Sequence, residues 1–194
     1  MTNKSASFIA RQIIARYDVE AGETVSNLQL QKLLYYAQGW HLAFFGKPLF
    51  DAQLQAWDHG PVQPFVYREY KHFSWSSITL PLHEAKKEED PFLDCIKWFY
   101  GAIHGKELER QTHKELPWLR TYRNGEMELI IPNSLLTEFF RTGYGDHELH
   151  RQFVDYWYRF QYSVEPGSLS TVKLSQKEYS QKLHELGLDL EVAH

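Results

Sequence analysis

One long apolar stretch constrains the fold most. It begins with a cap at Ser26 or Asn27 and continues as NLQLQKLLYYAQGWHLAFFGKPLF, where Gly46 and Pro48 supply a stop signal. Two apolar stripes follow it at helical spacing: Leu30, Leu33, Ala37, Trp40 and Phe44 on one face, and Leu28, Tyr35 and Leu42 on a neighbouring face. A helix that is apolar over so much of its circumference is buried among several partners. The sequence therefore predicts a long central helix.

Shorter elements around this helix predict a mainly α fold, a compact helical domain with a small β element, at the margin of α+β. Helices are expected over 5–17, 65–73, 91–103, 106–113 and 132–141, and short strands over 53–58 and 127–132. The run HGPVQP at 59–64 is predicted as a turn because it holds two prolines close together, and KELPW at 114–118 is predicted as a loop.

The length of 194 residues predicts one domain with an appendage. The turn-rich TGYGD at 142–146 is the clearest internal boundary, so we expect a domain over 1–142 and a C-terminal helical extension over 143–194 that packs on it. The extension includes an aromatic helix, a PGSLS linker and a polar terminal segment.

The charge balance argues against nucleic acid as a partner. Lys and Arg number 21 against 25 Asp and Glu, which leaves a formal net charge of −4, and no basic recognition helix is evident. The single cysteine, Cys95, excludes an intramolecular disulfide and favours a reducing cytoplasm; its apolar neighbours predict a buried, inert thiol. No stretch approaches the ~20 apolar residues of a membrane span, so no membrane association is expected.

The 10 histidines raise the alternative of an enzyme. None belongs to a short metal-binding motif such as HExxH, and we expect His41, His59 and His113 to make local hydrogen bonds. Thr112, His113 and Glu115 could form an acid–base set, although capping of a helix end by Thr112 and His113 is favoured, with Pro117 and Trp118 holding the next loop against the core. We therefore expect no enzyme, metal or cofactor, and a cryptic metal-dependent hydrolase is kept as an alternative.

Lys32 lies on the same side of the central helix as Tyr36. Its side chain either extends to solvent or pairs with an acid such as Asp58 and holds the HGP turn in place. Gly60 and Pro61 are first of all structural, because glycine accepts positive φ and proline fixes its own φ.

Aromatic residues surround the helix of the extension, with Phe153, Trp157 and Phe160 on one face and Tyr156 on another. Tyrosine and tryptophan are frequent anchors of protein interfaces, so this set is a candidate specificity face. The alternative, in which the extension only packs on the domain, stays open.

From Ser26 to Tyr70 the chain resembles the Panacea domain family, in LQLQKLLYYAQGWHLA, GKPLFD, AW, HGPV and VYREY. A second block, LERQTHKELPW from Leu108 to Trp118, is similar to the TH-x-x-x-PW motif of the family, and LIIPNSLLTEFF is similar to its closing strand and helix. These blocks supply candidate residues for toxin binding or for the domain signature: Lys32, Tyr36, Trp40, His41, Trp57, His59, Gly60, Pro61, Thr112, His113, Pro117 and Trp118.

The resemblance implies a bacterial antitoxin of a type II-like toxin–antitoxin system, of the kind found on prophages and other mobile elements. Its expected partner is a cognate toxin encoded by an adjacent gene, neutralised by direct protein–protein interaction. The family also implies an alternative, a protease adaptor that delivers a bound toxin to a cellular protease. Whether the chain forms a homo-oligomer stays open.

Overall fold

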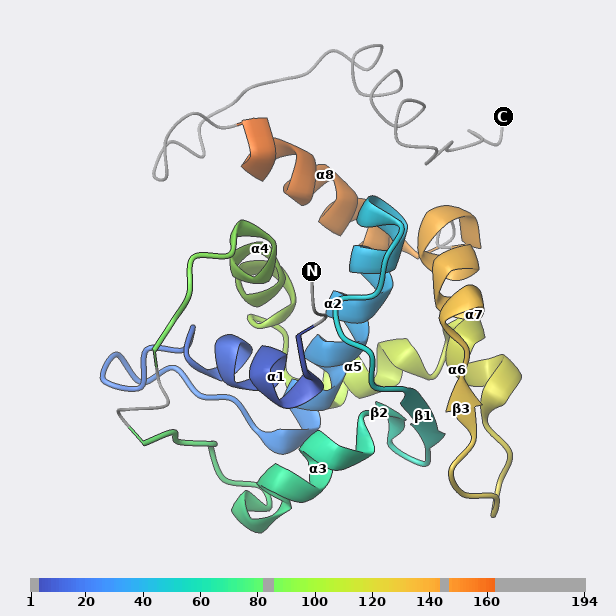
Figure 1. Ribbon diagram of the computed structural model, residues 1–194, viewed down its shortest axis with the longest axis horizontal. Helices are drawn as coiled ribbons and strands as arrows, with labels where there is room; N and C mark the ends of the chain where they lie inside the picture. The colour runs from blue at the N-terminus through green and yellow to red at the C-terminus, as the bar shows by residue number, and fades with distance from the viewer. Residues whose placement is uncertain (1–3, 82–85, 144–146, 163–194) are drawn as a thin grey trace.

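The computed structural model describes residues 4–81, 86–143 and 147–162, arranged around helix α2 (Asn27–Phe45) (Figure 1). The Ser26 hydroxyl accepts a hydrogen bond from the Gln29 amide, and Gly46 ends the helix in the left-handed conformation at φ 66°. Eight side chains of α2 have no exposed surface: Leu30, Lys32, Leu33, Leu34, Tyr35, Tyr36, Ala37 and Trp40. The predicted central helix is confirmed.

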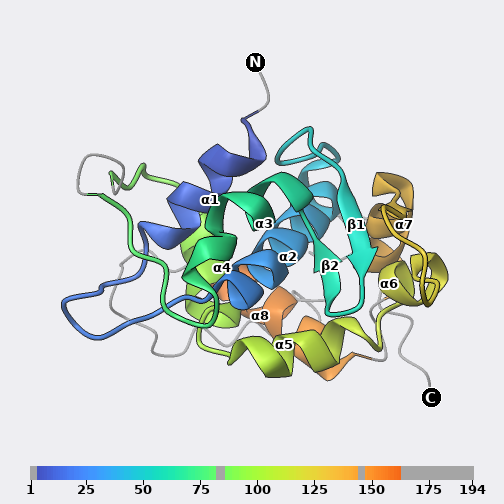
Figure 2. The ribbon, with the colours of Figure 1, turned by 90° about the horizontal axis from the view of Figure 1, so that it is seen from below.

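The other helices surround α2, and the view from below shows it enclosed between them (Figure 2). They are α1 (Ala6–Ile14), α3 (Pro64–Tyr70) with a 3₁₀ turn (Lys71–Phe73), α4 (Pro91–Tyr100), α5 (Gly105–Thr112), α6 (Leu116–Thr121), α7 (Asn133–Glu138) with a π-helical turn (Phe139–Gly143), and α8 (Glu148–Tyr162). The mainly helical class is confirmed. None of the described helices combines the length and apolarity needed to cross a membrane.

Three short strands form an antiparallel sheet in the order β2-β1-β3: β1 (Leu54–Trp57), β2 (Gly60–Val62) and β3 (Ile130–Ile131). The prediction of a turn over all of 59–64 was wrong, because Gly60–Val62 pairs with β1 and Pro64 begins α3. Pro61 is tolerated in β2 because β2 lies at the sheet edge, where its missing N–H removes no ladder bond.

The prediction of a loop over 114–118 was also wrong, because α6 begins at Leu116. Pro117 lies in the first turn of α6, where a backbone N–H has no partner within the helix, so proline is compatible with this position. Helices at Pro64 and Pro91 begin in the same way.

A close approach between α2 and the π-helical turn depends on a glycine. A Cβ atom at Gly39 would lie 2.2 Å from Cε2 of Phe140. Phe140 also makes an edge contact with Trp40, with 4.9 Å between ring centroids. The two segments pack as closely as they do because position 39 has no side chain.

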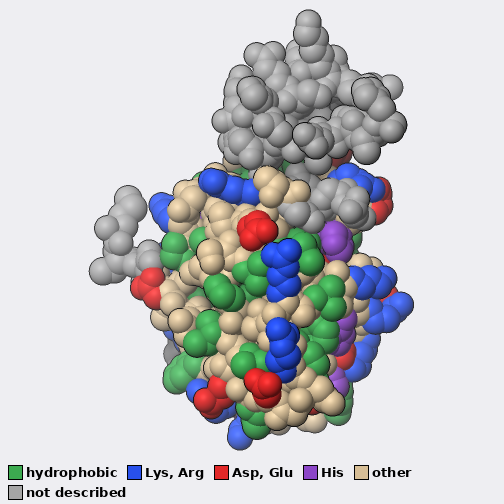
Figure 3. All heavy atoms as spheres, turned by 90° about the vertical axis from the view of Figure 1, so that its right-hand side faces the viewer, with side chains coloured by type: hydrophobic (Ala, Val, Ile, Leu, Met, Phe, Trp, Pro, Cys, Tyr) green, Lys and Arg blue, Asp and Glu red, His purple; other side chains and the backbone are tan. Residues whose placement is uncertain are grey.

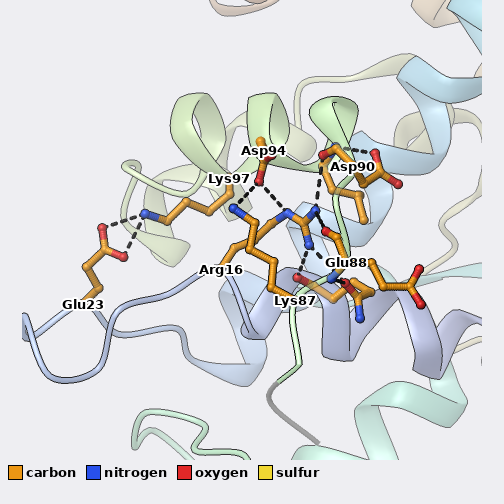
Figure 4. A network of polar contacts seen from close by, with 9 residues as sticks. Arg16, Glu23, Lys87, Glu88, Asp90, Asp94 and Lys97 are labelled. Carbon is orange, nitrogen blue, oxygen red and sulfur yellow. Dashed lines mark hydrogen bonds and ion pairs between the residues drawn. The ribbon is translucent and has the colours of Figure 1, made fainter. Parts of the chain in front are cut away.

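Polar contacts at the buried guanidinium of Arg16 join α1 to α4 and to the segment before it (Figure 4). Its Nε donates to Asp94 Oδ1 at 2.9 Å, and its Nη2 donates to the carbonyls of Glu88 (2.9 Å) and Asp90 (3.2 Å). Because one side chain satisfies a carboxylate and two backbone carbonyls, it fixes the start of α4 against α1. Cys95 of α4 is buried as predicted, and burial raises the pKa of its thiol.

Helix α8 packs its aromatic residues against the C-terminal half of α2. Phe153 and Trp157 are buried, with ring centroids 5.1 Å from Trp40 and 5.6 Å from Phe44, respectively. The predicted PGSLS linker and terminal segment lie outside the described residues. The domain boundary at residue 142 stays a prediction.

We predict that Gly39→Ala destabilises the protein by about 2 kcal/mol, because overpacking against Phe140 costs more than the gain in helix propensity. Urea unfolding of the full chain measures this. The double variant Gly39→Ala/Phe140→Leu should lose less stability than the two single changes summed. A Gly39→Ala protein as stable as the wild type would contradict the predicted clash.

Candidate binding site

A surface pocket of about 640 Å³ lies at the N-terminal end of α2. Its walls come from the start of α2, the β1–β2 hairpin, α3 with its 3₁₀ turn, the beginning of α5, and the loop 124–127. Three of the candidate residues, Lys32, Trp57 and His59, line it. The volume lies within the range of pockets that hold small ligands or anchor side chains.

Polar side chains of α2 hold the walls of this pocket in place. Asn27 Nδ2 donates to the Tyr67 carbonyl at 3.1 Å, and Gln31 Oε1 accepts from the Gln63 amide at 2.9 Å. Gln31 Nε2 donates to Asn27 Oδ1 at 2.9 Å, which links the two contacts. The hairpin and α3 are therefore fixed to the central helix by hydrogen bonds from its first two turns.

Lys32 makes the third such contact. Its side chain is fully buried, so the prediction that it extends to solvent is wrong, and Nζ donates to the Pro61 carbonyl at 3.0 Å. The lysine thus holds the HGP segment as predicted, through this carbonyl; the Asp58 carboxylate instead accepts a hydrogen bond from the Tyr122 hydroxyl. Burial lowers the pKa of the Lys32 ammonium to about 7, against the attraction of Glu109 and Glu115.

Gly60 is required directly above this ammonium group. Its φ is 89°, and a Cβ atom there would lie 2.8 Å from Lys32 Nζ and 2.6 Å from Thr112 Oγ1. Glycine therefore serves both the backbone conformation of the hairpin and the close approach of the lysine. Gly60 has the positive φ that the sequence predicted, whereas Pro61 lies in β2 rather than in a turn.

The rim of the pocket carries exposed apolar side chains that the sequence analysis did not select. Trp75 follows the 3₁₀ turn and Met127 lies in the loop before β3; their exposed fractions are 75% and 81%. Tyr67 of α3 lies edge-on to Trp57 of β1, with 5.1 Å between ring centroids. No element was predicted at Trp75, and Met127 is the first residue of the strand predicted over 127–132, of which only Ile130–Ile131 forms β3, so the sequence pattern marked neither residue as part of a binding site.

Glu115 is the centre of a second, fully buried group of polar side chains. Its carboxylate accepts hydrogen bonds from the Tyr35 hydroxyl at 2.6 Å, the Tyr36 hydroxyl at 3.0 Å and His150 Nε2 at 2.9 Å. We call these four residues the Glu115 cluster. Tyr100 extends it, because its hydroxyl lies 3.0 Å from His150 Nδ1 and accepts from Trp40 Nε1 at 2.8 Å.

The Glu115 cluster is electrostatically satisfied. Burial raises the pKa of the Glu115 carboxyl, but the attraction of His150 and the hydrogen bonds from His150, Tyr35 and Tyr36 outweigh this effect, so the pKa lies below its ordinary value.

The predicted acid–base set of Thr112, His113 and Glu115 does not form. Thr112 Oγ1 donates to the Glu109 carbonyl, and His113 Nε2 lies 3.0 Å from the Asp58 carbonyl.

The histidines in the matching blocks order local structure, as expected. His41 Nδ1 lies 2.7 Å from the Lys47 carbonyl, beyond the end of α2. His59 Nδ1 lies 2.8 Å from Glu109 Oε1, which joins the hairpin to α5. Within residues 4–81, 86–143 and 147–162, no three His, Cys, Asp or Glu side chains lie close enough together to hold a metal ion.

Pro117 and Trp118 lie at the start of α6, beside the hairpin. Pro117 is buried, and Trp118 Nε1 donates to the Trp57 carbonyl at 2.9 Å. Trp40 and Tyr36 face the interior and leave no surface for a partner. The structure thus places Trp40 and His41 away from the hairpin and brings eight candidates together around it: Lys32, Trp57, His59, Gly60, Pro61, Thr112, His113 and Trp118.

The candidate specificity face of α8 divides into two kinds of residue. Phe153 and Trp157 are buried, whereas Tyr156 and Phe160 are half-buried. Only the latter two leave surface that another protein could contact. A role of α8 in specificity stays a prediction.

We predict that stability rises between about pH 7 and about pH 9 by up to ~1.4 kcal/mol per pH unit because of Lys32. The unfolded lysine keeps its proton in this range, whereas the folded one releases it, so raising the pH favours the folded state. Urea unfolding across this range should show the rise in wild type and in Lys71→Met, a change at an exposed lysine, but not in Lys32→Met. Parallel profiles for all three proteins would contradict the low pKa.

We predict that Glu115→Gln lowers the free energy of unfolding by about 3–5 kcal/mol, because buried donors lose their charged acceptor. The lowered pKa of Glu115 also predicts the direction of the pH dependence. The carboxylate stabilises the fold above the pKa of the unfolded state, and this stabilisation is lost as the pH falls through the pKa of the folded state. Denaturant titrations from neutral to acidic pH measure both. The matched change at exposed Glu138, Glu138→Gln, should leave stability and its pH dependence nearly unchanged, and similar losses at the two positions would rule the prediction out.

Comparison with known proteins finds a family match in the middle of the chain. Residues 30–119 match the family described as "Antitoxin SocA-like, Panacea domain", which is a little under half of the chain. A stretch of 44 residues is 54% identical to "Antitoxin SocA" of Caulobacter vibrioides (strain NA1000 / CB15N). This stretch covers 23% of this chain and 23% of that relative. No solved structure matches the chain.

The matched segment includes most of α2, the hairpin, α3, α4, α5 and the beginning of α6, and therefore the walls of the pocket except Asn27, Leu28 and the loop 124–127. It also supplies three members of the Glu115 cluster, while His150 comes from α8. The resemblance found in the sequence is confirmed: residues 30–119 match the SocA-like Panacea domain.

Proposed function

We propose that this chain is an antitoxin that neutralises a cognate toxin by binding it directly as a folded protein. The observation that carries the proposal is that the segment matching the SocA-like Panacea family supplies most of the walls of the exposed pocket around the start of α2. The 44-residue stretch that is 54% identical to a protein named "Antitoxin SocA" supports the same class of function. The toxin is proposed to be the product of an adjacent gene.

A binding function fits the chemistry of the domain better than catalysis. Two buried charged groups at the centre of the domain are engaged: Lys32 with a backbone carbonyl, and Glu115 with three donors. His59 and His113 are engaged with Glu109 and a backbone carbonyl. Such groups make the domain rigid, and a rigid surface loses little conformational entropy when a partner binds.

Expression of the adjacent gene alone should arrest bacterial growth, and co-expression of this chain should restore it. Affinity purification of the tagged chain should then recover the toxin as a stable complex. A neighbouring gene product that is harmless, or growth rescue without any complex, would argue against direct neutralisation.

The same experiment separates the protease-adaptor alternative. Direct masking leaves the amount of toxin unchanged or raised, because a bound toxin is protected. An adaptor lowers the amount of toxin, and the loss disappears in a strain lacking the protease. Immunoblotting of the toxin during co-expression therefore decides between the two mechanisms.

A further inference from the structure

We infer that the pocket at the start of α2 binds a toxin segment that inserts one large apolar side chain and carries a carboxylate beside it. This inference rests on the proposed antitoxin function, because the partner is the toxin. It assigns the contact surface within the domain and the chemistry of the segment that fits it.

The distribution of exposed apolar side chains points to the pocket. Among the large hydrophobic residues of the described chain, Met127 and Trp75 have the highest exposed fractions, 81% and 75%. They lie on separate loops about 50 residues apart in sequence, yet both line this one pocket, and Tyr67 joins them there. Large apolar side chains that remain in water around a concave site mark an interaction site rather than packing.

The walls of the pocket are held in place before any partner arrives. Asn27, Gln31 and Lys32 hold α3 and the hairpin through hydrogen bonds of 2.9–3.1 Å. The volume of about 640 Å³ admits a whole aromatic or long aliphatic side chain with its flanking backbone. An anchor that enters such a preformed site loses less entropy than one that must order its receptor.

The charges around the pocket favour a toxin segment with an acidic residue next to the inserted apolar side chain. Lys71 lines the wall near Trp75 and forms no ion pair within the part of the chain that the structure describes. Lys106 extends over the Trp75 ring, with Nζ 5.7 Å from the centroid, while pairing with Glu109 at 2.8 Å. Of the acidic groups in the lining, Asp58 already accepts from Tyr122, and Glu126 lies in the loop with Met127. A carboxylate of the toxin next to the inserted side chain could therefore form an ion pair with Lys71.

Basic side chains also gather on another part of the surface. Figure 3, which faces the side of the molecule that bears α6, α7 and β3, shows lysine and arginine side chains gathered along one edge, with fewer acidic side chains among them. A patch of one sign steers the approach of an oppositely charged partner. The overall charge of −4 therefore does not describe this side of the protein.

We take the occupant to be a toxin segment, because the pocket combines exposed apolar side chains with a lysine available to a partner's carboxylate. Helix α8 of this chain does not line the pocket: the pocket lies at Asn27–Lys32, whereas α8 packs against Trp40 and Phe44 in the C-terminal half of α2.

The test measures the affinity of the full chain for the toxin identified by growth rescue. We expect Trp75→Ala and Met127→Ala each to raise the dissociation constant at least about tenfold, as for anchor-contacting residues. Trp98→Ala is the matched control, since Trp98 is a 59% exposed tryptophan on α4, away from the pocket, and it should bind as the wild type does. Lys71→Glu should weaken binding several-fold, and the loss should shrink at high salt.

Several outcomes would overturn the inference while the antitoxin function stands. Unchanged affinity in both Trp75→Ala and Met127→Ala would place the toxin elsewhere, and tighter binding by Lys71→Glu would mean a basic flank. Dimers of the free protein that Trp75→Ala dissociates, detected by sedimentation, would assign the pocket to a second copy. Crosslinking of a photoreactive residue at position 75 to the chain's own C-terminal peptide would assign it to that segment. Wild-type protein that binds no toxin would instead remove the proposed function itself.

Discussion

The structure depends on the burial of α2 on every side. A helix surrounded in this way buries its polar side chains along with the apolar ones, and each must find a partner within the protein. Gln38 illustrates the result: its Oε1 accepts from the Leu49 and Phe50 amides, and its Nε2 donates to the Phe50 carbonyl. Gln29 donates to the carbonyls of Gly101 and Ile103 in the same manner. The central helix therefore holds surrounding loops by hydrogen bonds as well as by apolar contact.

This arrangement connects the fold to the proposed binding face. The polar row Asn27, Gln31 and Lys32 holds the hairpin and α3, and these elements present Trp57, Tyr67 and Trp75 around a hollow. The pocket is thus a consequence of how the buried helix satisfies its own polar groups. Its walls are fixed, while the apolar side chains at its rim remain in water.

The Glu115 cluster shows that the matched segment does not form the core alone. Glu115, Tyr35 and Tyr36 lie within residues 30–119, but the third donor to the carboxylate is His150 of α8. Without His150 the buried carboxylate would lose a hydrogen bond and an attractive partner, which is costly in a site without water. Helix α8 is therefore part of the packed core, whatever further contact its half-buried Tyr156 and Phe160 make.

Sequence reasoning found the part of the candidate site that local pattern encodes. Lys32, Trp57, His59 and the Gly60–Pro61 turn stand in dense blocks, and all lie at the hairpin. It missed Trp75 and Met127 because local pattern does not show which exposed side chains, 52 residues apart in sequence, the fold brings to one pocket. It grouped Glu115 with its sequence neighbours Thr112 and His113. The hydrogen-bond partners of Glu115 are instead Tyr35, Tyr36 and His150, which are 80, 79 and 35 residues away in sequence.

The sequence by itself determined the central helix, its ends and the mainly helical class, because capping residues, stop signals and apolar periodicity act between residues a few positions apart. Only the tertiary structure decided that Lys32 is buried against Pro61, that Pro61 lies in an edge strand, and that His150 completes the Glu115 cluster. Each of these depends on groups brought together from distant parts of the chain. Burial changes the energy of a charge or a hydrogen bond far more than neighbouring sequence does.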